Sequence, residues 1–312
     1  MANKLRKCLS LLTDAGNEFL DDNGSKLSAS LAYYTLFSIG PLLLVIITLL
    51  GFFYKRAFIT TEIFDKARGI IGASATAQLQ TLLVNMSHQA NKTLIGIVGI
   101  LVFIFGATGI FSEIQGSLNY IWSIKAKPKR SWLKYITDRL LSLVLVIGLG
   151  VLLMVTILLN LLIDMLSGRM QQFLHEGSIT FIKWGNFGLL FIVVTTVFMV
   201  MFKVLPDAWI HWKDALIGAA FTAILFLIGK YLISYYLSFS KSLDLYGAAT
   251  SIIVMLSWVY YSSLILYYGA AFTEVYAHRY GKGIAVKDNA VHILKHEMKD
   301  LSPKRDIQSG ND

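Results

Sequence analysis

Six apolar runs are the feature of this sequence that most constrains its fold. Each is about 20 residues or longer, the length at which a helix crosses a hydrocarbon core of about 30 Å. They cover residues 30–53, 93–120, 140–163, 181–204, 215–237 and 248–276. Composition agrees, because 55% of the 312 residues are hydrophobic and 15% are charged. The sequence therefore predicts an all-α, polytopic integral membrane protein with six transmembrane helices.

The placement of lysine and arginine predicts the orientation of these helices. If the six runs alternate across the membrane, 19 of the 28 Lys and Arg residues lie on the side that holds both termini. Eight lie on the other side, and Lys230 lies within a run. Because cytoplasmic loops carry the excess of cations, we expect both termini in the cytoplasm.

Three polar segments flank or interrupt the predicted transmembrane domain at 30–280. Residues 1–29 place apolar side chains at helical spacing, which predicts a cytoplasmic amphipathic helix on the membrane surface or on the bundle. The loop at 54–92 is the longest and predicts a short helix on the extracytoplasmic side. The tail at 281–312 is polar, and we expect it to be partly helical and partly disordered in the cytoplasm.

Glu113 shares a helical face with a row of small residues. Gly106, Gly109 and Gly116 are spaced three and seven apart, so they fall with the acid on a face about 100° wide. Such a row lets a second helix approach closely, and an acid within a span faces protein or a water-filled cavity. We expect close packing along this row, with Glu113 serving either as a satisfied buried acid or as part of a functional site.

Lys230 is a cation inside the fifth run, where a charge costs about 3 kcal/mol on insertion scales. Its helix runs outward, and a rise of about 1.5 Å per residue places it in the outer third of the membrane. Two roles fit this depth: the ammonium binds an anionic headgroup, or it snorkels to the outer interface beside Tyr231 and Tyr235. Glu113 lies about 20 Å deeper by the same rise, so we do not expect an ion pair.

A polar vestibule is predicted at the cytoplasmic end of the bundle. Glu274, near the end of the sixth run, shares a helical face with Tyr260, Ser263, Tyr267 and Ala270. This inward stripe meets the polar end of the second run. The predicted lining of the vestibule is Glu113, Gln115, Asn119, Arg139 and Glu274.

A proline interrupts the first run directly after a glycine. Proline has no amide hydrogen and crowds the carbonyl one turn earlier, so a kink is expected at Gly40 and Pro41. We interpret this pair as a hinge that permits helix movement.

The loop after the second run is strongly basic, with cations at Lys125, Lys127, Lys129 and Arg130. Such a cluster determines topology and attracts anionic lipid headgroups, by about 1 kcal/mol per cation near the surface. RNA binding is disfavoured, because no RNA-binding module or stacking platform accompanies the cations. The predicted partners are therefore membrane lipids and not nucleic acid.

The sequence offers little that points to metal binding or catalysis. His292 and His296 are spaced i, i+4 but lack the remaining ligands of a zinc site, so a solvated helix face is the better interpretation. No nucleophile motif or convincing acid pair is evident. We therefore expect no metal, no cofactor and no enzymatic activity.

Several long motifs resemble the YihY/BrkB family of bacterial inner-membrane proteins. They are SASLAYYTLFS at 28–38, FSEIQGSLNYIW at 111–122, Leu205-Pro206-Asp207, and the stretch from Tyr246 to Ala270. The resemblance covers about residues 15–280. It implies a six-helix inner-membrane protein with cytoplasmic termini and a role in envelope homeostasis or transport of lipid-like molecules. Where many members read Gly-Ala-Glu-Leu, this chain reads GAAF at 269–272, with its acid at Glu274.

These features lead to one preferred function and two alternatives. The preferred function is transport or export of an amphiphilic, anionic component of the cell envelope across the bacterial inner membrane. A non-transporting scaffold, which recruits partners through the tail and the basic loop, is the alternative from another class. Ribonuclease activity, a name some members of the family have carried, finds no support in these residues. The sequence leaves open whether copies of the chain form a homo-oligomer.

Overall fold

The computed structural model describes residues 2–53, 109–127, 177–239 and 249–293, together with 136–137, 140–141, 144–145 and 148. Within this part of the chain, three helices are long and apolar enough to cross a membrane. Their apolar windows are Phe187–Val204, Trp212–Ile233 and Ile252–Arg279. They coincide with the fourth, fifth and sixth predicted spans, and most of the second and third lies outside the described residues.

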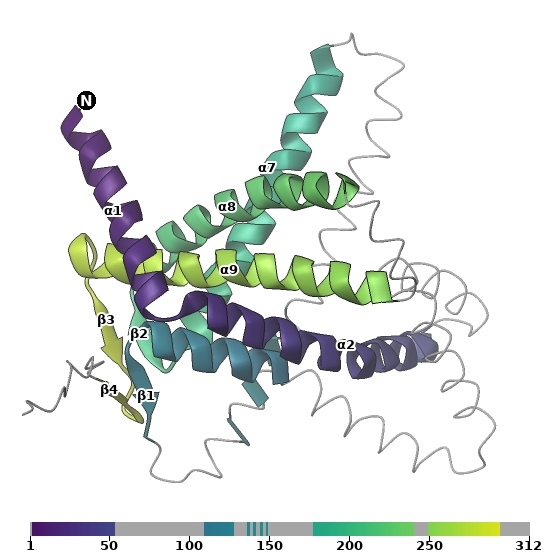
Figure 1. Ribbon diagram of the computed structural model, residues 1–312, viewed down its shortest axis with the longest axis horizontal. Coiled ribbons are helices and arrows are strands. Elements are labelled where there is room, and N and C mark those ends of the chain that lie inside the picture. Colours follow the sequence, from purple (N-terminus) through teal and green to yellow (C-terminus); the bar gives the residue numbers. More distant parts are fainter. Residues whose placement is uncertain are drawn as a thin grey trace, which may run out of the picture.

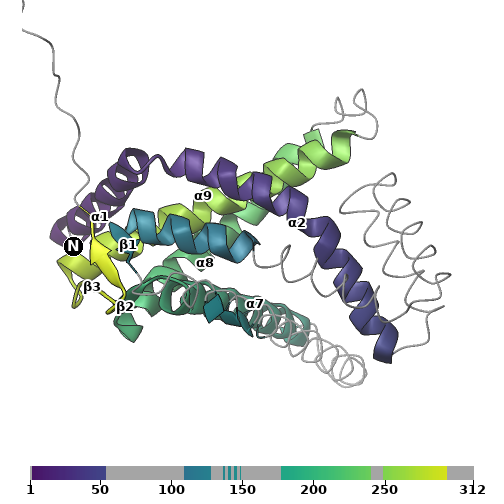
Figure 2. The same ribbon diagram turned by 90° about the horizontal axis from the view of Figure 1, so that it is seen from below.

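The described helices pack around α9. They are α1 (Ala2–Asp21), α2 (Gly24–Phe53), α7 (Gly177–Val204), α8 (Trp212–Phe239) and α9 (Ala249–Arg279), with a further helical stretch at 109–121. α9 contacts α1, α2 and α8, and α7 packs against α8. Figure 1 shows α2, α8 and α9 running side by side, while α7 leaves at a steep angle. Figure 2 shows the stretch at 109–121 alongside this group and α2 changing direction along its length.

Glycines allow α8 and α9 to approach closely. A Cβ placed on Gly218 would lie 1.9 Å from Thr273 Oγ1, and one on Gly269 would lie 2.0 Å from Thr222 Oγ1. Real side chains cannot approach so closely, so each glycine accommodates a threonine of the other helix. This small-residue seam was not predicted.

The predicted glycine row behaves differently. A Cβ on Gly109 would make an ordinary contact with Ser38 at 3.5 Å, but one on Gly116 would meet nothing within 4 Å among the described residues. Gly116 is exposed. The prediction of close helix packing is therefore wrong at Gly116, because periodicity places residues on one face but does not say which face a neighbour covers.

Two short antiparallel ribbons accompany the helices, and the fold is otherwise helical, as predicted. Strand β1 (Ile124–Ala126) pairs with β4 (Ala290–His292), and β2 (Ala208–Ile210) pairs with β3 (Ile284–Val286), both antiparallel. Each strand has three residues, too few for a period-two pattern to stand out in the sequence. Residues 284–292 were expected to be helical or disordered. Instead they contain β3 and β4, which pair with the strands that follow α7 and the stretch at 109–121. We call this end of the bundle the ribbon end.

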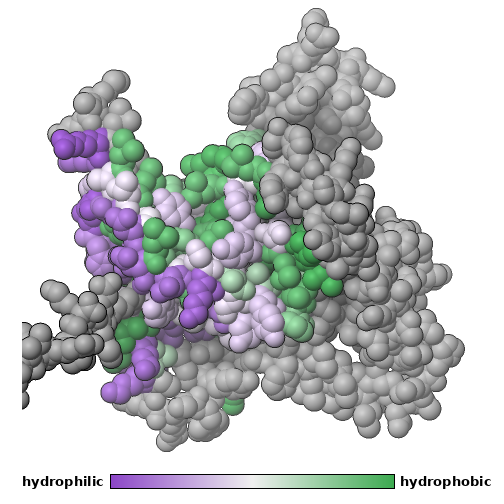
Figure 3. All heavy atoms as spheres, in the orientation of Figure 1, coloured by the Kyte–Doolittle hydropathy of each residue, from purple (hydrophilic) through white to green (hydrophobic). Residues whose placement is uncertain are grey.

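Hydropathy changes along the bundle axis. Figure 3 shows hydrophilic residues gathered over α1 and the end of α9, and hydrophobic residues covering the part of the bundle away from the ribbon end. A lipid-exposed surface must be apolar where it meets hydrocarbon. The ribbon end therefore lies at or beyond one membrane interface.

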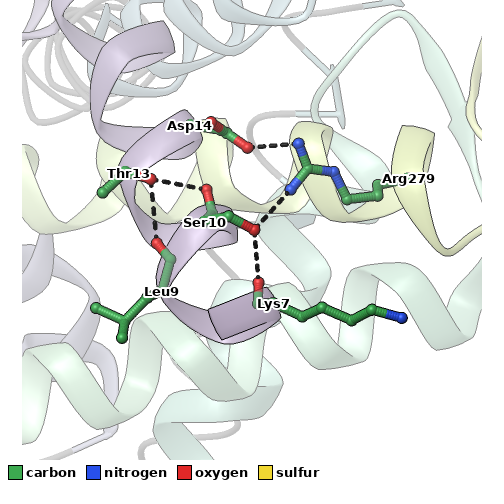
Figure 4. Close-up of polar contacts among 6 residues, drawn as sticks. All are labelled: Lys7, Leu9, Ser10, Thr13, Asp14 and Arg279. Atoms are coloured by element: carbon green, nitrogen blue, oxygen red, sulfur yellow. Dashed lines mark hydrogen bonds and ion pairs between the residues drawn. The ribbon is translucent and has the colours of Figure 1, made fainter. Parts of the chain in front are cut away.

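The amphipathic N-terminal helix packs on the bundle. Leu11 and Ala15 of α1 are buried against Phe272 of α9. The Tyr268 hydroxyl donates a hydrogen bond to the Leu12 carbonyl at 3.1 Å. On the exposed side, Figure 4 shows the Arg279 guanidinium reaching Asp14 and the Ser10 hydroxyl. Apolar burial holds this contact, because an exposed ion pair contributes only about 0–1 kcal/mol.

Candidate functional site

One face of α9 carries polar side chains into the interior of the bundle. Ser263, Tyr267, Ala270 and Glu274 are buried, as the sequence predicted for this face, and Glu274 is 9% exposed. Buried polar residues within a membrane span are costly and mark functional paths or tight packing. This inner face begins at the ribbon end with Glu274 and continues into the bundle as far as Ser263.

The stretch at 109–121 adds polar groups opposite this face. Ser117 and Glu113 lie near the Tyr267 hydroxyl. Tyr267 Oη and Ser117 Oγ are buried, and neither has a hydrogen-bond partner within 3.5 Å among the described residues. Buried hydroxyls normally have such a partner, so this position suits a water molecule or a polar group of a ligand.

The ribbon-end part of the same stretch is locked by hydrogen bonds. Asn119 Nδ2 donates to Asp207 Oδ2 at 3.0 Å, and the Asp207 amide donates to Asn119 Oδ1 at 2.8 Å. Trp122 Nε1 donates to the Ala270 carbonyl at 3.1 Å. All of these partners are buried. Asn119, predicted to line the vestibule, thus uses its amide to join the connection after α7 to the bundle.

An open pocket of about 410 Å³ lies where α1 meets the end of α9. It is lined by Glu18, Glu274, Val275, His278 and Arg279. The carboxylates of Glu18, Asp22 and Glu274 lie within 4.8 Å of one another. Carboxylates so close together attract a nearby cation. The pocket therefore offers both acidic and basic groups to a polar ligand.

The sequence singled out Glu274 but missed Glu18 and Asp22. Asp22 lies in the turn between α1 and α2, where acids are common because they cap helices. The two acids come together with Glu274 only because α1 folds back onto α9. No local pattern indicates a contact between residues about 250 positions apart.

The predicted vestibule residues divide into two groups. Glu113 lies near Tyr267, whereas Glu274 is seven residues further along α9, about 10 Å at the helical rise. Gln115 is buried. Arg139 lies outside the described residues.

The remaining predicted residues are spread over the chain. Lys230 is exposed on α8, and Lys125 and Lys127 are exposed at β1. Lys129 and Arg130 lie outside the described residues. Gly40 and Pro41 lie within α2, which is helical from Gly24 to Phe53, and their role as a hinge stays a prediction.

Long apolar helices with a polar inner face define a helical membrane protein with several spans. Comparison with known sequences identifies the family of membrane proteins. The family model described as virulence factor BrkB matches residues 15–292. The chain belongs to this family.

Relatives cover most of the chain at modest identity. A UPF0761 membrane protein of Tolumonas auensis is 29% identical over 256 residues, or 79% of this chain and 78% of the relative. A UPF0761 membrane protein of Vibrio campbellii is 30% identical over 256 residues, or 80% and 76%. YfkH of Bacillus subtilis, whose name describes it as ribonuclease-like, is 26% identical over 267 residues, or 84% and 93%. No solved structure matches the chain.

Proposed function

We propose that this protein resides in the bacterial inner membrane and moves an amphiphilic, anionic component of the cell envelope. The observation that carries the proposal is the polar inner face of α9, which is continuous with the open pocket through Glu274. From Glu274 to Ser263 the face extends about 16 Å at the helical rise, roughly half the hydrocarbon thickness. A scaffold needs neither an opening nor an interior polar path.

The pocket suits the headgroup of such a molecule. His278 and Arg279 supply donors for phosphate or carboxylate, and Glu18 and Glu274 supply acceptors for hydroxyl or ammonium groups. Val275 and the apolar helix surfaces next to the pocket suit an acyl chain. If the ribbon end faces the cytoplasm, as the cation distribution predicts, the pocket opens toward the inner leaflet.

Leaflet exchange in reconstituted vesicles tests the proposal. Full-length protein in liposomes is supplied with a fluorescent phosphatidylglycerol analogue, and dithionite bleaching measures how fast the label crosses the bilayer. We expect wild-type protein to accelerate exchange, and Glu274→Gln to slow it about tenfold, the effect of about 1.4 kcal/mol. Asp288→Asn, which removes an exposed acid outside the pocket, is the matched control and should leave the rate unchanged.

The outcomes separate transport from the alternative scaffold role. Wild-type vesicles that exchange the label no faster than protein-free vesicles would contradict transport of this lipid class. Equal slowing by Glu274→Gln and Asp288→Asn would remove the pocket from the path. We also propose that the protein is not an enzyme, and release of nucleotides from RNA by purified wild-type protein would overturn that statement.

A further inference from the structure

Two exposed tryptophans lie close together in the chain where α8 begins, at the ribbon end. Trp209 in β2 is 59% exposed and Trp212, the first residue of α8, is 57% exposed. Large aromatic side chains are favoured in such positions where one end of the ring meets lipid and the other meets water. In the sequence, only the Leu205-Pro206-Asp207 motif distinguishes this connection.

Two lysine ammonium groups lie against these rings. Lys203 Nζ is 5.9 Å from the centroid of the Trp209 ring and 5.2 Å from that of Trp212. Lys287 Nζ, from the C-terminal segment between β3 and β4, is 5.7 Å from the Trp209 ring. All three distances fall within the range of a cation–π interaction.

The backbone holds both ammonium groups in place. Lys203 Nζ donates to the Ile210 carbonyl, and Lys287 Nζ donates to the Pro206 carbonyl at 2.7 Å. The Lys287 amide also donates to the Asp207 carbonyl at 3.1 Å, which anchors the segment that carries this lysine. A cation that is already positioned loses less side-chain entropy when an anion binds.

The cluster lies at a membrane interface. One apolar window ends at Val204 and the next begins at Trp212, so the connection at 205–211 turns at the surface of the bilayer. Tryptophan is enriched at this depth, and lysines there meet the phosphates of the headgroups.

The charges around the cluster favour an anion. Lys213 is exposed nearby and adds to the positive potential. Two acids of the region are buried and engaged by the protein: Asp207 by Asn119, and Asp214 by the Lys282 amide at 3.1 Å. Asp288 is the exposed acid beside Lys287. Cations thus outnumber accessible acids around the two rings.

We propose that Lys203, Lys287, Trp209 and Trp212 form a binding site for an anionic phospholipid in the leaflet at the ribbon end. The ammonium groups bind the headgroup phosphate, and the indole rings pack against the glycerol and upper acyl chain. The site shares no residue with the pocket at Glu274. It therefore anchors the bundle whether or not that pocket carries a substrate.

Quenching of tryptophan fluorescence by brominated lipid tests this site. Full-length protein is placed in phosphatidylcholine nanodiscs that contain brominated phosphatidylglycerol or, at the same fraction, brominated phosphatidylcholine. The difference between wild type and Trp209→Phe/Trp212→Phe isolates the signal of the two rings. We expect the anionic lipid to quench this signal more strongly than the neutral one.

Lysine variants show whether charge at this position is responsible. Lys203→Gln/Lys287→Gln should weaken phosphatidylglycerol binding by about fivefold per lysine, or about thirtyfold together. Lys7→Gln/Lys26→Gln removes the same charge from exposed positions elsewhere and should have little effect. Lys203→Arg/Lys287→Arg should retain binding, which separates loss of charge from damage to the fold.

Three outcomes would overturn the proposal. Equal quenching by the two brominated lipids would show interfacial burial without headgroup selection. Unchanged quenching in the glutamine pair would remove the lysines from the site. Absence of quenching by either lipid would show that the rings face water or another protein.

Discussion

Replacing Gly269 by alanine tests the seam between α8 and α9. The new Cβ would lie 2.0 Å from Thr222 Oγ1 and 2.8 Å from both Thr222 Cβ and Cγ2. Thr222 is fully buried, and its hydroxyl already donates to the Gly218 carbonyl at 2.7 Å. The threonine therefore cannot rotate away without breaking a hydrogen bond, so the two helices must separate.

The expected change in the free energy of unfolding follows from three contributions. Overpacking costs about 1–3 kcal/mol, and losing the threonine hydrogen bond costs about 1 kcal/mol. Against these, alanine is favoured over glycine inside a helix by about 1 kcal/mol. We expect Gly269→Ala to lower the free energy of unfolding by about 1–3 kcal/mol, measured by far-ultraviolet circular dichroism in mixed micelles with increasing dodecyl sulfate.

Two further variants make this prediction decisive. Gly188→Ala on α7 is the matched control, because its Cβ would meet nothing within 4 Å in the part of the chain that the structure describes, and it should be neutral or stabilising. Thr222→Ala removes the atom closest to the new methyl group, so it should restore part of the stability of Gly269→Ala. Equal stability of Gly269→Ala and Gly188→Ala, or strict additivity with Thr222→Ala, would refute the reasoning.

Three other changes test the ribbon end and the outer part of α8. Asn119→Ala removes two hydrogen bonds to the buried Asp207, so we expect a loss of about 1–3 kcal/mol in the same unfolding assay; an unchanged midpoint would contradict this. Ile284→Asp buries a charge at a position that is 7% exposed and should lower the midpoint strongly, whereas Ala285→Asp at the exposed neighbour should not. Lys230→Met should abolish accelerated lipid exchange if this cation binds the headgroup at the outer level, and an unchanged rate would reject that role.

The spans of α8 and α9 were predicted closely. The runs at 215–237 and 248–276 correspond to α8 (Trp212–Phe239) and α9 (Ala249–Arg279). Length and hydropathy suffice here, because bilayer thickness sets how many apolar residues a spanning helix needs. The inward direction of Glu274 was also predictable, since the helical period places it with Ser263 and Tyr267.

Partners across the fold were not predictable. The approach of Glu18 and Asp22 to Glu274 depends on how α1 docks, and the position of Lys287 beside Trp209 depends on the pairing of β2 with β3. Each brings together residues distant in the chain, and three-residue strands carry too little pattern to reveal their pairing.

The sequence by itself determined that this is a helical membrane protein, where its described spanning helices lie and which face of α9 is polar. These are local properties, set by apolar length and by a period of 3.6 residues. Only the tertiary structure decided that α8 and α9 meet through Gly218 and Gly269, while Gly116 stays open. It also decided which charged residues meet in the pocket and which lie beside Trp209 and Trp212. Helix packing and strand pairing bring these residues together, and both depend on contacts between distant parts of the chain.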